Sequence, residues 1–123
     1  MLVAAFIILG VVVLLGSVLA VLHLRVNAAT MPPWPLAALH GLLAVGGLCC
    51  LALALRGPPR GLDQGTASFG IIATALITLA ALVGGGLLAA HVFKRRIAGV
   101  TIAIHATLAV SGFVILAAYV FAG

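Results

Sequence analysis

The sequence predicts an all-α integral membrane protein, a four-transmembrane-helix bundle built from two tandem two-helix hairpin repeats. The composition, the length of the apolar stretches and a repeat of histidines and glycines predict it. Hydrophobic residues make up 66% of the 123 residues and charged residues only 6%, against roughly 25% charged residues in an ordinary soluble domain. Water is therefore not the solvent for most of the surface, and we expect the lipid bilayer to surround the chain.

The charged residues divide the chain into four apolar stretches, and each is long enough to cross a bilayer, which takes about 20 residues. These stretches are Leu2 to Leu24, Pro35 to Leu55, Thr66 to Phe93 and Ile97 to Gly123. Because backbone amides without water must bond within their own segment, we expect helices. The first stretch is too long for the apolar part of a secretory signal, so we expect a retained helix. The single transmembrane domain then covers residues 1–123.

Two segments of the first half recur in the second half. Residues 16–23 (GSVLAVLH) align with residues 84–91 (GGGLLAAH), and residues 40–47 (HGLLAVGG) align with residues 105–112 (HATLAVSG). Leu and Ala match easily in apolar sequence, so the histidines and glycines at equal offsets carry the inference. They predict two hairpins of the same orientation, over 1–56 and 62–123, related by a pseudo-two-fold axis along the membrane normal.

Basic residues lie at the ends of the predicted spans. One end of the bundle, which we name face X, carries four of them: Arg25, Lys94, Arg95 and Arg96. The opposite end, face Y, carries both termini, Arg56, Arg60 and the only acid, Asp63. The excess on face X predicts that it is cytoplasmic and that the termini are outside, in a membrane such as the bacterial inner membrane. For a formal charge of +5 we expect anionic lipid or a cofactor carboxylate as partner, not nucleic acid.

All four histidines of the chain lie toward face X, one in each span. An ionisable side chain inside a span is costly and marks a candidate functional site. His40 and His105 lie deeper than His23 and His91. On each helix a glycine lies seven residues from the histidine, two turns deeper and on nearly the same face. These glycines are Gly16, Gly47, Gly84 and Gly112.

This pattern suits a flat macrocycle held edge-on between helices. Its iron would take an imidazole from either side, and its edge would need the space left by glycine. Helices joined by short connections occupy neighbouring corners of a bundle, so the second and fourth spans are diagonal, as are the first and third. Haem propionates would point to face X, where Arg25, Lys94, Arg95 or Arg96 could pair with them.

In these features the chain resembles the four-helix membrane b-type cytochromes, in general character the cytochrome b561-like group, whose helices supply paired axial histidines. The resemblance rests on His23, His40, His91 and His105 with their glycines. It implies haem b and electron exchange with quinone or a partner oxidoreductase. The two-haem b561 pattern puts its histidine pairs near opposite faces, whereas both pairs here lie near face X. We therefore expect one haem per chain, and a second only if the helices do not form a simple square.

We prefer His40 and His105 as the iron ligands because they are deeper and leave room for the propionates above them. His23 and His91 are the alternative pair. In the preferred arrangement they would cap propionates, contact a quinone headgroup or bind a second metal.

Other functions stay open at this point. Four imidazoles could bind copper or zinc, and a chlorophyll-type pigment needs one histidine per macrocycle. A small transporter is less well supported, because Asp63 lies in a loop and no carboxylate lies within a span. The glycines could also serve helix packing alone. No carboxylate pair or activated serine supports catalysis. The sequence therefore favours a non-catalytic electron-transfer or anchor subunit, with other redox subunits or further copies as partners.

Aromatic residues near face Y are predicted to form an interfacial belt in contact with the lipid headgroups. The residues concerned are Tyr119 and Phe121.

Overall fold

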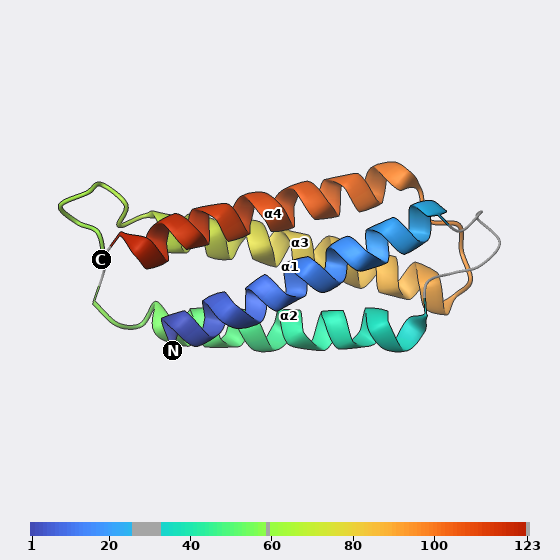
Figure 1. Cartoon of the computed structure of the whole chain (residues 1–123), viewed down its shortest axis with the longest axis horizontal. Helices are drawn as coiled ribbons and strands as arrows, with labels where there is room; N and C mark the ends of the chain where they lie inside the picture. Colours follow the sequence, from blue (N-terminus) through green and yellow to red (C-terminus); the bar gives the residue numbers. More distant parts are fainter. Residues whose placement is uncertain (26–32, 59, 123) are drawn as a thin grey trace.

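The computed structural model describes residues 1–25, 33–58 and 60–122, and in these ranges all regular structure beyond turns is α-helical. The helices are α1 (Leu2–Arg25), α2 (Trp34–Ala54), α3 (Phe69–Val92) and α4 (Gly99–Phe121). They lie lengthwise beside one another, with both chain ends at the same end of the bundle (Figure 1). Each helix is long and apolar enough to cross a membrane. The prediction of an all-helical integral membrane protein with four spans is confirmed.

Two helices begin later than the apolar stretches predicted. Helix α3 begins at Phe69, because Thr66 belongs to the preceding loop, where its backbone N–H donates to the Gly61 carbonyl at 3.0 Å. Helix α4 begins at Gly99, after an extended Ala98. Hydropathy alone does not separate a helix from an apolar loop end, so these boundaries depend on local hydrogen bonds.

The helices form a square in chain order. Helix α1 packs against α2 and α4, and α3 packs against α2 and α4, whereas neither α1 and α3 nor α2 and α4 are neighbours. The two diagonals are therefore those predicted from short connections between consecutive helices. Contacts are densest between α1 and α2 and between α3 and α4.

Burial is confined to the half of the bundle that ends at face Y. Among the described residues, every buried residue lies within 5–12, 47–51, 70–80 or 112–122. Leu51 and Leu116 are the largest fully buried side chains of this core, and the rings of Phe6 and Phe113 stack at 5.1 Å between α1 and α4. In the half that ends at face X, no described side chain is fully buried. The helices thus pack tightly at one end only.

Tyr119 belongs to this core. Only 4% of its surface is exposed, whereas Phe121 is 77% exposed. The prediction of an interfacial belt is therefore wrong for Tyr119, because its ring packs inside the bundle against the α3 residue Gly70. Phe121 has the exposure expected of a belt residue.

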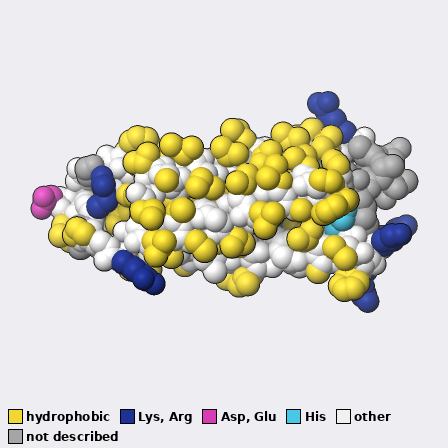
Figure 2. All heavy atoms as spheres, turned by 90° about the horizontal axis from the view of Figure 1, so that it is seen from below, with side chains coloured by type: hydrophobic (Ala, Val, Ile, Leu, Met, Phe, Trp, Pro, Cys, Tyr) yellow, Lys and Arg dark blue, Asp and Glu magenta, His cyan; other side chains and the backbone are white. Residues whose placement is uncertain are grey.

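On the face seen in Figure 2, hydrophobic side chains cover the middle of the molecule, and Lys and Arg side chains lie at its two ends. Such a surface suits lipid around the middle and water or headgroups at the ends. Helix α1, with 24 residues, is about 36 Å long and exceeds a hydrocarbon layer of about 30 Å. Its ends therefore reach the headgroup regions.

The basic connection between α3 and α4 begins with a Schellman motif. Beyond Phe93, which caps α3, the backbone N–H of Arg95 donates to the Ala90 carbonyl at 2.8 Å and that of Lys94 donates to the His91 carbonyl at 3.1 Å. The motif requires a left-handed residue, a position that favours glycine. Here it is Lys94, with φ 52°.

We expect Lys94→Gly to raise the free energy of unfolding by about 1 kcal/mol, because glycine adopts the left-handed conformation without steric cost. Reversible unfolding in mixed detergent, followed by far-UV circular dichroism, measures this. Lys94→Ala is the matched control, because it removes the same charge and keeps the Cβ. An equal gain in both variants would attribute the effect to charge and contradict the backbone explanation.

Candidate cofactor site

His40 and His105 meet across one diagonal of the bundle. They come from α2 and α4, which do not pack against each other. Their imidazole centroids are 6.0 Å apart, with the ring planes at 70°. Both rings are half-buried. The structure therefore brings together the histidine pair that the sequence predicts as the preferred ligands.

Each of these imidazoles is held by a backbone carbonyl of the helix that precedes it. Nδ1 of His40 lies 3.0 Å from the Val12 oxygen on α1, and Nδ1 of His105 lies 2.8 Å from the Ala80 oxygen on α3. A carbonyl oxygen only accepts, so Nδ1 must carry the proton and donate it. In the neutral ring Nε2 is then the unprotonated nitrogen, which is the form that binds a metal.

Glycines make these two hydrogen bonds accessible. A Cβ on Gly16 would lie 2.9 Å from Cε1 of His40, and a Cβ on Gly84 would lie 2.9 Å from Cε1 of His105. A helical Cβ is tilted toward the preceding turn, so at these two positions it would stand over the carbonyl four residues earlier. Glycine leaves that carbonyl open to a second donor, the imidazole.

The other two predicted glycines receive aliphatic side chains. A Cβ on Gly47 would lie 2.8 Å from Leu9, and a Cβ on Gly112 would lie 2.7 Å from Ile77. All four glycines were predicted to give space to a macrocycle edge. In the structure these spaces are filled by side chains of the neighbouring helix, imidazoles in two cases and aliphatic chains in the other two.

His23 and His91 do not join the central pair. They lie in the last turns of α1 and α3, on the other diagonal. Both are half-buried, and neither imidazole forms a hydrogen bond with another described residue. The basic residues Arg25, Lys94, Arg95 and Arg96 are exposed at the same end of the bundle.

The four histidines do not converge on one point. Over residues 1–25, 33–58 and 60–122, no three ligating side chains come close enough to hold a metal ion together. A four-imidazole copper or zinc site therefore lacks the converging ligand set that it requires.

The backbone oxygens of Val12 and Ala80 are parts of the site that the sequence did not reveal. Backbone acceptors have no side-chain signature. The available signal was a glycine four residues later, in register with a histidine on the next helix. Gly16 and Gly84 are predicted site residues, but the structure places each against the histidine of the neighbouring helix instead of the histidine of its own helix.

Neither a model of a known protein family nor any curated protein or solved structure matches this chain. The function proposed below therefore rests on the contacts of the chain itself.

The spaces beside Gly16 and Gly84 that the imidazoles occupy, which we call the glycine notches, lead to a prediction about stability. Gly84→Ala forces the His105 ring away from its 2.9 Å contact and weakens the bond to Ala80, a loss of about 1 kcal/mol. Gly85→Ala is the matched control, because a Cβ there meets nothing within 4 Å. We expect Gly84→Ala to be about 1 kcal/mol less stable than Gly85→Ala in detergent unfolding experiments. Equal stabilities would show that the imidazole does not occupy the notch.

Proposed function

We propose that the chain is a membrane electron-transfer protein or anchor subunit that binds one haem b between His40 and His105. The observation that supports this most is the position of the two imidazoles. They lie across a diagonal with centroids 6.0 Å apart. An imidazole nitrogen bonds a metal at about 2 Å, so two imidazoles on opposite sides of one metal hold their ring centroids roughly 6 Å apart.

The hydrogen bonds to Val12 and Ala80 support the same proposal. Histidines that bind metals usually donate their second ring N–H to a carbonyl or carboxylate, which fixes the tautomer and the ring orientation. Here both rings have that anchor, and it reserves Nε2 for a ligand. A merely interfacial histidine would satisfy its polar atoms with water or headgroups instead.

Looser packing toward face X also fits a bound group. The buried core ends at the level of Val12 and Ala80, and the helix segments beyond it contain no fully buried described residue. A macrocycle between the helices there would supply the missing contacts. The side chains that fill the notches at Gly16 and Gly84 are the proposed ligands themselves, so these glycines would position the ligands rather than clear the ring edge.

The exposed basic residues at face X would pair with the propionates. The helices that carry His23 and His91 end at or just before these cations, which are Arg25, Lys94 and Arg95. Charge-assisted pairs with carboxylates are strong hydrogen bonds. His23 and His91 would cap the propionates or contact a quinone headgroup. We further propose that face X is cytoplasmic, in a bacterial inner membrane.

The two hairpins are proposed to be repeats of one unit. Extending the alignment of Gly16 with Gly84 by four residues places Val12 opposite Ala80. The histidine contacts correspond under this alignment, as do the contacts of Gly47 with Leu9 and of Gly112 with Ile77. Matching contacts on matching positions support a duplicated hairpin more strongly than the sequence alone.

Haem, when bound, supplies one-electron redox chemistry. The protein's own part is to hold two neutral imidazoles, exclude water with its apolar helices and neutralise the propionates. We propose no acid-base step. Electrons would pass to or from a quinone or a partner oxidoreductase.

The proposal predicts a b-type absorption spectrum for the detergent-purified chain expressed with haem supplied. On reduction with dithionite we expect a sharp α-band, with one haem per chain by pyridine haemochrome assay. His40→Ala and His105→Ala should each abolish this band, because each removes one ligand and its anchor.

His23→Ala is the control, and it should retain the band. A band lost in His23→Ala and His91→Ala, but kept in the other two variants, would assign the iron to the alternative pair. A colourless protein that folds normally would exclude haem. Metal titration would then test copper or zinc binding at the His40 and His105 pair.

A further inference from the structure

Each imidazole of the central pair shares its backbone carbonyl with a glycine. In an α-helix the N–H of a residue donates to the carbonyl four residues earlier, so the Val12 oxygen accepts from the N–H of Gly16 within α1. The same oxygen lies 3.0 Å from Nδ1 of His40. A carbonyl oxygen has two lone pairs and can accept both bonds. The Ala80 oxygen of α3 holds His105 in the same way, at 2.8 Å. We call each contact between an imidazole and a helix carbonyl a carbonyl anchor.

The carbonyl anchors lie in apolar surroundings. Val12 is 8% exposed and Ala80 is 2% exposed, and both imidazoles are half-buried. The two oxygens are the only hydrogen-bond acceptors that the described residues offer to these rings. A hydrogen bond is electrostatically stronger in such a medium than in water. Each anchor therefore acts strongly on the charge of its imidazole.

A hydrogen bond at Nδ1 changes the imidazole as a metal ligand. An imidazole that donates its second ring N–H to an oxygen is a more basic ligand at Nε2. A more basic ligand favours the ferric over the ferrous ion, because the ferric ion carries one more positive charge. Burial among apolar helices acts in the opposite direction, since it disfavours the state with the extra charge. Both effects set the reduction potential of a bound haem.

We propose that the two carbonyl anchors, at Val12 and Ala80, lower the reduction potential of haem bound by the histidine pair and so offset part of the effect of its apolar surroundings. This inference rests on the proposed function. Gly16 and Gly84 are positioning residues, because they leave the carbonyls open to the imidazoles and act on the iron only through them. The anchors belong to different hairpins, so each contributes separately.

Potentiometric titration of the reduced α-band, with the haem-loaded full chain in detergent, tests this inference. Gly84→Ala pushes the His105 ring from its 2.9 Å contact and weakens its anchor. We expect the reduction potential to rise by about 30 mV, the one-electron equivalent of an about threefold shift toward the reduced form. Gly16→Ala should act equally on His40, and the double variant should show about twice the rise. Each hairpin offers its own test, so one variant that binds haem is enough.

Gly85→Ala is the matched control, because it adds the same methyl group to α3 where a Cβ meets nothing within 4 Å. It should keep the wild-type potential. Equal potentials in Gly84→Ala and Gly85→Ala would overturn the inference and leave haem binding standing, since a purely structural anchor changes stability alone. A wild-type chain without the α-band would overturn the proposed function itself, and the inference with it.

Nitrogen-15 NMR of the histidine-labelled chain without haem tests the carbonyl anchors directly. We expect His40 and His105 to carry their proton on Nδ1, with signals assigned by their loss in His40→Ala and His105→Ala. Gly16→Ala should alter the signals of His40, and Gly84→Ala those of His105. A proton on Nε2 of both rings in the wild type would show that the carbonyls do not hold the imidazoles, and would overturn the inference whether or not haem binds.

Discussion

An imidazole placed among apolar helices needs a partner for its N–H, and in this bundle that partner is a backbone carbonyl made accessible by a glycine on the neighbouring helix. Val12 and Ala80 supply these carbonyls, and Gly16 and Gly84 leave them uncovered. The constraint acts once in each hairpin. It ties the register of α2 to α1 and of α4 to α3, because each ring needs both a carbonyl and the glycine four residues after it.

The same contact sets the boundary between two kinds of packing. Below it, toward face Y, small residues such as Ala5, Ala73 and Gly47 let the helices approach closely around Leu51. Without a hydrophobic driving force in lipid, such close contact is the main source of helix association. Above it, toward face X, half-buried histidines and exposed cations replace the buried core. The bundle is therefore packed more tightly toward face Y than toward face X.

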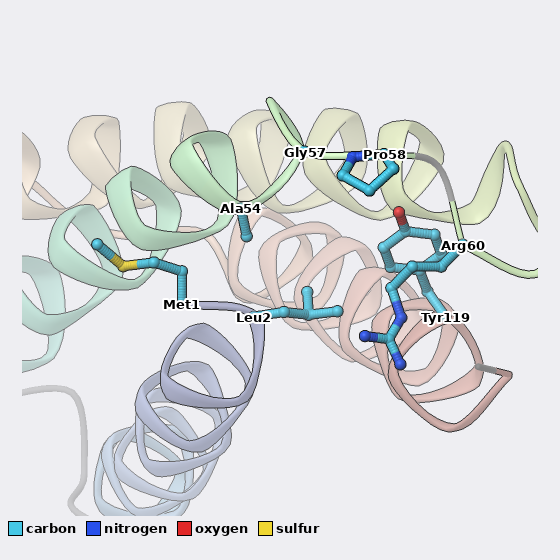
Figure 3. Close-up of a pocket in the computed structure, with 7 residues that line it drawn as sticks. All are labelled: Met1, Leu2, Ala54, Gly57, Pro58, Arg60 and Tyr119. Carbon is cyan, nitrogen blue, oxygen red and sulfur yellow. The ribbon is translucent and has the colours of Figure 1, made fainter.

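The two ends of the bundle also differ in the side chains that they bring together. Toward face X, paired imidazoles have their Nδ1 atoms engaged and their Nε2 atoms available, as a metal ligand requires. At face Y, Arg60 and Tyr119 line a small pocket between the ends of α1, α2 and α4 (Figure 3). No carboxylate lies within the described spans.

The sequence by itself determined the four spans and their helical state, and it predicted the square arrangement that places His40 and His105 on one diagonal; that their rings meet was decided by the tertiary structure. Apolar length and short connections are local properties, and the diagonal follows from them. Only the tertiary structure decided which side chain each glycine receives, which carbonyls hold the imidazoles and that Tyr119 is buried. These depend on the rotation of each helix about its axis. Because every face of these helices is apolar, no hydrophobic stripe in the sequence fixes that rotation, and side-chain packing between neighbours does.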